Sequence, residues 1–309
     1  MANYLGIDVG GTAVKWALVT EGFEILERGE IPTAFSSAEE ALSAYERIAA
    51  PLAGRFEAVG ASVPGSVFDD DPDCTVHRGG ALPYMNGVPV AAELRERLGV
   101  PAVAYNDGKC CVLGEYAAGA LRGCKVGVAM AIGTGIGGGI IIDGKVLNGP
   151  HACAGELSFL RNDATAPLTM DNIFALTSGW KGLRTAVMRE KGLDATDDAL
   201  RRSIDGRQIF EWINAGDEAA QRGLDEYAKV VAAHLINLQA VLDPDAFAIG
   251  GGISRQPALI EALNRQVQEQ VAPLTGLLAG FPVPQVVAAE LGNDANLYGA
   301  VSLAQQLIA

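Results

Sequence analysis

Two glycine-rich stretches decide the fold of this chain: IDVGGTAVKWALV at residues 7–19 and IGTGIGGGIII at residues 132–142. In each stretch an apolar strand enters a turn of small residues and a second apolar strand leaves it. Each second strand ends in another turn, Glu21-Gly22 in one copy and Asp143-Gly144 in the other. Glycine lets backbone N–H groups converge on phosphate oxygens, so such turns form anion cradles. Two cradles about half the chain apart predict two similar lobes, a nucleotide and phosphoryl transfer.

Composition limits the function classes. The 309 residues allow two domains, and 49% hydrophobic with 19% charged residues is typical of a soluble globular protein. The net charge of −14 and the lack of a basic stripe argue against nucleic-acid binding. We expect a cytoplasmic protein, because no apolar run reaches about 18 residues and a strand starts near Tyr4, which leaves no room for a signal peptide. We expect the five cysteines to be free thiols.

Hydrophobic periodicity predicts the remaining elements. Two three-stranded meanders are expected at residues 4–30 and 125–147. Further strands are expected at 57–63, 101–105, 246–249 and 285–289. Helices are expected at 36–52, at 90–98, after Gly108 to about Leu121, across 172–242, from 257, and to 307.

Residues 133–138 match the dinucleotide fingerprint G-x-G-x-x-G, but the match misleads. That fingerprint needs a helix after the glycines, whereas a β-branched run and a hairpin turn follow here. Protein kinases also place a strand after a glycine-rich turn, but their downstream motifs are absent. The alternative interpretation is two glycine-rich hairpins without a ligand.

Polar residues at the ends of strands are the candidates for chemistry. Asp8 ends a buried strand before the first cradle, where its carboxylate could hold magnesium through water; the alternative is a turn cap. Asp107 follows another strand and could accept the proton of an attacking hydroxyl that Asn106 orients; the alternative is a helix N-cap. Glu156 could accept hydrogen bonds from sugar hydroxyls, or be a solvated side chain. The glycines at 250–252 would let a flat base lie on the backbone, or form a plain turn.

As a set, these motifs resemble the ROK family of bacterial sugar kinases and sugar-responsive repressors, over nearly the whole chain. The matching segments, in order, are DVGGT at 8–12, Asn106-Asp107, IGTGIGGG at 132–139, Gly155-Glu156, IGGGIS at 249–254 and LGNDANLYGA at 291–300. The resemblance implies an α/β, actin-like (ribonuclease H-like) ATPase fold with two similar lobes and a cleft between them. We expect one lobe at residues 1–118 plus 291–309 and the other at 119–290. The last helix should pack on the N-terminal lobe.

The resemblance also implies roles for individual residues. Asp107 would be the general base, with Gly65, Asn106 and Glu156 contacting the sugar. ATP would be held by the two cradles and the third glycine run; the expected residues are Asp8, Gly10, Gly11, Thr12, Lys15, Gly133, Thr134, Gly135, Gly250, Gly251 and Gly252. Magnesium would accompany the ATP, with Asp8 as its ligand through water. A homodimer is the habit of the family.

The chain departs from the family pattern at several positions. Phe159 stands where most members have a zinc-binding histidine, and residues 161–170 contain no cysteine, so we predict no structural zinc. The ring of Phe159 could stack on a sugar face or an aglycone. Asp171 is a weak candidate for the second sugar-binding carboxylate. The usual lysine after the first cradle is displaced: Ala13 stands there, and Lys15 lies two residues further on. These departures indicate an atypical, zinc-free branch.

The sequence therefore favours an ATP-dependent kinase acting on a primary hydroxyl, expected to be O6, of a hexose such as glucose. A β-glucoside kinase of the same family is the alternative. From other classes, a sugar-sensing repressor and a chaperone-like actin-fold ATPase remain as rivals. The expected partners are a sugar and ATP, without nucleic acid or membrane.

Overall fold

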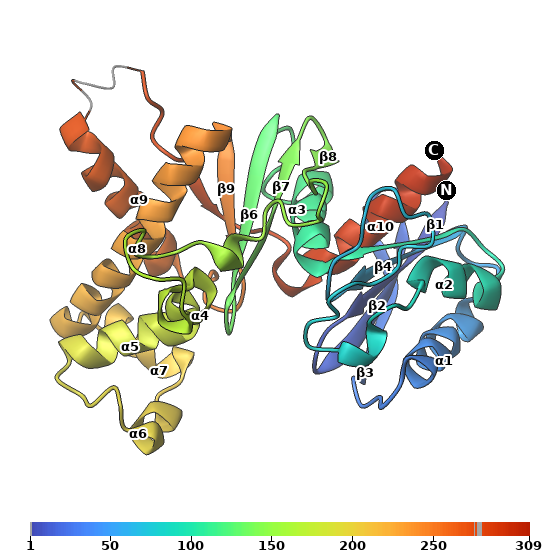
Figure 1. Cartoon of the computed structure of the whole chain (residues 1–309), viewed down its shortest axis with the longest axis horizontal. Coiled ribbons are helices and arrows are strands. Elements are labelled where there is room, and N and C mark those ends of the chain that lie inside the picture. The colour runs from blue at the N-terminus through green and yellow to red at the C-terminus, as the bar shows by residue number, and fades with distance from the viewer. Residues whose placement is uncertain (1, 275, 277–279) are drawn as a thin grey trace. The chain divides into compact units, whose positions relative to one another are not determined.

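The structure is a computed structural model that describes residues 2–274, 276 and 280–309. It contains two five-stranded sheets, each accompanied by helices (Figure 1). Contacts divide the chain into two compact units. Unit 1 comprises Met1–Arg122, Gly139–Gly155 and Asn293–Ala309, and unit 2 comprises Gly123–Gly138 and Glu156–Gly292.

The sheet of unit 1 has the strand order β3-β2-β1-β4-β5. Its strands are β1 (Asn3–Val9), β2 (Ala13–Thr20), β3 (Ile25–Pro32), β4 (Ala58–Val63) and β5 (Ala102–Asn106). The first three strands form the predicted antiparallel meander, whereas β4 is parallel to both β1 and β5. Parallel strands end at one edge of a sheet, so the residues at the ends of β1, β4 and β5 are brought to the same edge.

Helices cover both faces of this sheet. The helices of unit 1 are α1 (Ala38–Ala49), α2 (Val90–Leu98), α3 (Asp107–Ala118) and α10 (Ala295–Ile308). Helices α1 and α2 pack on one face through the main apolar core, and α10 packs on the other (Figure 1). The helix predicted at 36–52 is confirmed as α1, and its N-cap is Ser37, whose side chain accepts a hydrogen bond from the N–H of Glu40.

The last helix returns to the N-terminal sheet, as predicted. Leu297 and Val301 of α10 share a buried cluster with Tyr4 of β1. The backbones approach closely at Gly60 of β4, where a Cβ atom would lie only 1.8 Å from the carbonyl oxygen of Ala300. The packing of α10 on β4 therefore requires glycine at position 60.

The second sheet has the order β10-β9-β6-β7-β8. Its strands are β6 (Val126–Ile132), β7 (Ile136–Ile142), β8 (Lys145–Val146), β9 (Ala246–Gly250) and β10 (Val286–Ala288). The division into units falls within β7, after Gly138. Strand β9 pairs in parallel with β6 and with β10. The predicted second meander and both later strands are confirmed.

Unit 2 is completed by helices built around α8. The helices are α4 (Phe174–Ser178), α5 (Trp180–Glu190), α6 (Asp198–Ser203), α7 (Gly206–Asn214), α8 (Glu218–Leu242) and α9 (Pro257–Val271). Short 3-10 turns occur at Ala50–Leu52, Pro83–Met85, Leu157–Phe159, Met170–Asn172, Ala272–Leu274 and Gly292–Asp294. Helices α5, α7 and α9 pack on α8. Among the described residues, none of the helices combines the length and apolarity that a membrane crossing requires.

Candidate active site

Asp8 lies at the end of β1, at the sheet edge where the parallel strands terminate. Asp8 is only 7% exposed, and its Oδ1 accepts hydrogen bonds from Ser62 Oγ (3.0 Å) and Asn296 Nδ2 (3.1 Å). Within the described part of the chain, Oδ2 accepts no hydrogen bond. A fixed carboxylate with one uncommitted oxygen suits a hard cation such as Mg²⁺, bound directly or through water. Burial raises the pKa of Asp8, against the hydrogen bonds from Asn296 and Ser62, which lower it.

The raised pKa of Asp8 predicts that its charge destabilises the protein without ligand. The folded protein keeps the Asp8 proton above the ordinary pKa of 3.8, where the unfolded chain has lost it, so stability falls as the pH rises through this range. In Asp8→Asn the amide oxygen still accepts both hydrogen bonds. We expect its melting temperature without nucleotide to exceed that of the wild type by a few degrees at neutral pH, with a smaller gap near pH 4.

Asp71→Asn is the matched control, because hydrogen bonds from Thr75 lower the pKa of Asp71 and its charge stabilises the fold. That variant should therefore melt lower than the wild type at neutral pH. Scanning fluorimetry across the pH range measures both. A melting temperature of Asp8→Asn below that of the wild type at neutral pH would contradict the interpretation.

The first cradle is a tight turn between β1 and β2. The N–H of Gly10 donates to the carbonyl of Ala13 (3.0 Å), and Thr33 Oγ1 donates to the carbonyl of Gly10 (2.7 Å). Gly11 and Thr12 are exposed at the tip. Lys15 lies on β2 opposite Asp8, and its Nζ donates to the carbonyl of Asn293 (3.3 Å) rather than pointing away from the fold. The displaced lysine is thus held against the segment before α10.

Gly65, Asn106 and Asp107 are brought together at the same sheet edge. Asn106 ends β5, and its Nδ2 donates to the carbonyl of Gly65 (2.7 Å) and to Asp107 Oδ1 (3.0 Å). Asn106 is also the N-cap of α3, since its Oδ1 accepts the N–H of Lys109 (3.2 Å). Gly65 has φ +98°, a conformation that favours glycine.

Asp107 is the first residue of α3. Its Oδ1 also accepts the N–H of Gly108 (2.8 Å), and the positive end of the helix favours a negatively charged carboxylate. Asn106, and not Asp107, is the N-cap of α3. A half-buried, oriented carboxylate at this edge can accept a proton from a bound hydroxyl.

The second cradle opens into a pocket of unit 2 with a volume of about 600 Å³. Gly133, Thr134 and Gly252 line it, so the second and third glycine runs meet there. The close approach requires glycine: Gly251 has φ +93°, and a Cβ atom there would lie 2.1 Å from the carbonyl oxygen of Ile132. The remaining lining residues are Ile132, Trp180, Gly206, Arg207, Phe210, Glu211, Asn214, Ile253 and Gln256.

Sequence reasoning missed the helical side of this pocket. Arg207, Phe210, Glu211 and Asn214 lie on α7 at i, i+3, i+4 and i+7, which places them on one face. The spacing can be seen in the sequence, but it indicates a shared helix face only once the helix is known to begin at Gly206. Trp180, the first residue of α5, adds an aromatic side chain, and the backbone N–H of this residue donates to the carbonyl of Gly133 (3.0 Å).

Three further predicted residues lie in the loop region before α4. Glu156 is half-buried and precedes the turn Leu157–Phe159, where Phe159 is 66% exposed. Asp171 is exposed in a separate turn, Met170–Asn172. The exposed ring of Phe159 is compatible with the expectation that it meets a ligand.

The two mixed five-stranded sheets and their helices define a protein of the actin-like ATPase fold, as predicted. The chain belongs to the ROK family, whose sequence profile matches residues 4–307. It is 31% identical over 301 residues to the bifunctional enzyme NanE/NanK of Brucella melitensis, covering 97% of this chain and 53% of that protein. The chain thus spans about half the length of that relative.

Two other relatives match along their whole length. The chain is 26% identical to the N-acetyl-D-glucosamine kinase of Escherichia coli, covering 97% of this chain and 98% of that protein. The structure resembles that of a ROK family glucokinase from Streptomyces griseus in complex with glucose and AMPPNP, with a TM-score of 0.77, 27% identity and coverage of 99% and 100%.

Proposed function

We propose that this chain is an ATP-dependent sugar kinase that transfers the γ-phosphate to a primary hydroxyl, O6, of a hexose such as glucose. The observation that carries the proposal is the carboxylate of Asp107, oriented by Asn106 and Gly108 at the edge where β1, β4 and β5 end. Family membership and the nucleotide-bound glucokinase relative support ATP as the donor.

In the proposed reaction Asp107 accepts the proton of the sugar hydroxyl as its oxygen attacks the γ-phosphorus. A new O–P bond forms, the bond from phosphorus to the β,γ-bridging oxygen breaks, and ADP leaves with that electron pair. The proton held by Asp107 then returns to solvent. Asn106 and the carbonyl of Gly65, already joined by a hydrogen bond, orient the hydroxyl.

The proposed nucleotide contacts follow the glycine runs. Gly10, Gly11, Thr12, Gly133, Thr134 and Gly135 hold the phosphates, with Lys15 as a nearby cation, and Gly250, Gly251 and Gly252 flank the adenosine. Trp180 and Phe210 supply apolar surface for a base in the 600 Å³ pocket. Magnesium bound through water at Asp8 would neutralise phosphate charge.

The acceptor side leaves two substrate classes open. Glu156 is proposed to bind vicinal hydroxyls, and Phe159 and Asp171 are proposed to shape the rest of the sugar site. An exposed aromatic ring suits the apolar face of a sugar or the aglycone of a β-glucoside, so a β-glucoside kinase is the alternative. The lobe bounds 1–118 plus 291–309 and 119–290, a cytoplasmic location, a homodimer and a zinc-free site all stay predictions.

A coupled assay for ADP release decides the acceptor. The panel comprises glucose, mannose, fructose, their amino and N-acetylated counterparts, and β-glucosides. We expect turnover at least tenfold above the sugar-free rate with one class only, because a polar site rejects analogues that leave its groups unpaired. ADP release that no sugar stimulates would contradict the kinase and favour a chaperone-like ATPase.

A further inference from the structure

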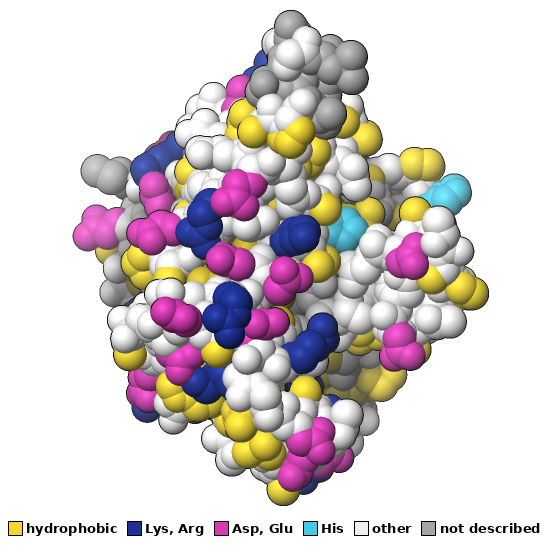
Figure 2. All heavy atoms as spheres, turned by 90° about the vertical axis from the view of Figure 1, so that its left-hand side faces the viewer, with side chains coloured by type: hydrophobic (Ala, Val, Ile, Leu, Met, Phe, Trp, Pro, Cys, Tyr) yellow, Lys and Arg dark blue, Asp and Glu magenta, His cyan; other side chains and the backbone are white. Residues whose placement is uncertain are grey.

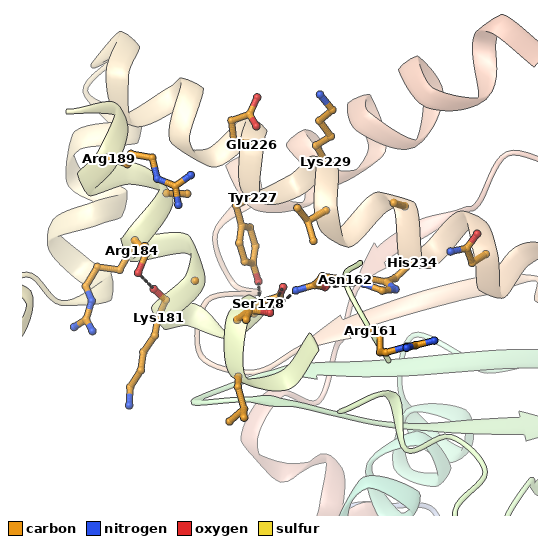
Figure 3. A pocket seen from close by; sticks show the side chains of 18 of the residues that line it. Arg161, Asn162, Ser178, Lys181, Arg184, Arg189, Glu226, Tyr227, Lys229 and His234 are labelled. Atoms are coloured by element: carbon orange, nitrogen blue, oxygen red, sulfur yellow. Dashed lines mark hydrogen bonds between the residues drawn. The ribbon is translucent and has the colours of Figure 1, made fainter. Parts of the chain in front are cut away.

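A second pocket of unit 2, with a volume of about 960 Å³, lies along α5 and α8 and has no role in the proposed transfer (Figure 3). We call it the α5–α8 pocket. Its lining includes one acidic side chain, Glu226, and six basic ones: Arg161, Lys181, Arg184, Arg189, Arg201 and Lys229. This excess of positive charge occurs in a chain whose net charge is −14.

The basic side chains of this pocket form fewer ion pairs than other arginines of the molecule do. Only Arg201 forms an ion pair with a described residue, Asp198 (3.0 Å); the other five basic lining residues form none within the described ranges. By contrast, Arg222 and Arg265, which lie outside the lining, pair with Glu190 and Asp225. Figure 2 shows basic and acidic side chains interspersed over the face that it presents.

Arg184 is a buried basic residue of this pocket. The residue is 8% exposed, and its buried Nε has no hydrogen-bond partner among the described residues. One terminal nitrogen donates to the carbonyl of Arg201 (2.7 Å), and the guanidinium lies 4.7 Å from the ring centre of Trp180. A buried cation without a counter-charge is costly, and burial together with the charge of Arg201 lowers the pKa of Arg184.

The position of the basic residues on α5 adds to the electrostatic cost of their charge. Lys181 lies in the first turn of α5, where the helix dipole disfavours a cation, and Arg184 follows three residues later on the same face. In Figure 3, Lys181, Arg184 and Arg189 lie to one side of Tyr227 and Ser178, and Arg161 lies to the other. Positive groups on two sides of a large pocket fit a ligand with more than one anionic group.

We propose that the α5–α8 pocket binds a small organic phosphate with at least two anionic groups, and that this binding adjusts the nucleotide pocket. Guanidinium groups recognise phosphate with paired, charge-assisted hydrogen bonds, and those of Arg161, Arg184 and Arg189 line this pocket. The bound phosphate supplies the counter-charge that the protein lacks there.

The coupling runs through Trp180, and this part rests on the proposed function. The ring of Trp180 lies against the guanidinium of Arg184, and the same residue lines the nucleotide pocket. Its backbone N–H donates to the carbonyl of Gly133 in the second cradle (3.0 Å). Tyr227 fixes the preceding turn, because its hydroxyl donates to the carbonyl of Ser178 (2.7 Å). An anion that attracts the guanidinium of Arg184 would shift the Trp180 ring that lies against it. Because Trp180 also lines the nucleotide pocket, the KM for ATP would change.

The test uses fructose 1,6-bisphosphate as the probe, and calorimetry on the full chain measures its binding. We expect saturable binding that weakens at least tenfold in Arg184→Gln and in the exposed double variant Arg189→Gln/Lys229→Gln. The double variant Arg222→Gln/Arg265→Gln removes the same charge from outside the pocket and should bind as the wild type does. Inorganic phosphate should bind at least tenfold more weakly than the probe.

Three results would each overturn the proposal. They are binding that does not saturate at millimolar probe, an equal loss of affinity in the control variant, and equal affinity for inorganic phosphate. Binding is read without turnover, so it stands or falls apart from the kinase assignment. Where the kinase is active, the probe should change the KM for ATP at least twofold in the wild type and not in Arg189→Gln/Lys229→Gln. An unchanged KM in the wild type would overturn the coupling.

Discussion

Asp107→Asn should lose at least a hundredfold in kcat while binding sugar and nucleotide almost unchanged. General-base catalysis contributes about 10²–10⁴-fold, and an amide cannot accept the hydroxyl proton. The local structure should survive, because Asn106, and not Asp107, caps α3 through its bond to the N–H of Lys109. Steady-state kinetics give kcat, and calorimetry with the sugar identified by the panel gives the affinity.

Asp197→Asn is the matched control for this substitution. Asp197 caps α6 by accepting the N–H groups of Ala199 and Leu200, so the variant removes the same charge beside another helix N-terminus. Asparagine is as good an N-cap as aspartate, so Asp197→Asn should fold. Near-normal turnover in Asp107→Asn would remove Asp107 from the mechanism, and an equal loss in Asp197→Asn would show that the effect is not specific.

The residues at the sheet edge could be predicted because they end strands or follow them directly. The sequence placed Asp8 at the end of a buried strand and Asp107 after another, and parallel pairing of β1, β4 and β5 brings such residues to one edge. Gly65 was reached through the family resemblance, and the structure adds the hydrogen bond that joins it to Asn106. What these residues do remains a proposal.

The helical side of the nucleotide pocket could not be predicted in the same way. Its residues on α7 are far in sequence from the glycine runs, and the packing of α7 on α5 and α8 brings Phe210 toward Thr134. Periodicity shows that residues 172–242 are helical but not how the five helices are oriented. The partners of Arg184 likewise depend on where α6 lies, which no local pattern specifies.

The packing of α10 on α3 gives the largest expected effect on stability. A Cβ atom at Gly114 of α3 would lie 2.0 Å from the carbonyl oxygen of Ala295, and one at Gly299 of α10 would lie 1.9 Å from that of Cys110. Helix propensity alone predicts that Gly114→Ala stabilises the protein by about 1 kcal/mol. We expect the opposite, because the contact is with backbone that cannot rotate away.

Gly114→Ala should therefore lower the free energy of unfolding by about 3 kcal/mol or more, and the melting temperature by about 5–10 °C. Gly22→Ala is the control, since its nearest neighbour atom, Thr20 Oγ1, is 3.9 Å away, and it should melt close to the wild type. Calorimetry and urea unfolding measure both. Because α3 begins at Asp107 and is held in place by α10, Gly114→Ala should also reduce kcat below its melting transition. An unchanged or raised melting temperature would mean that the two helices can separate without cost, and the rigid placement of Asp107 would then need another cause.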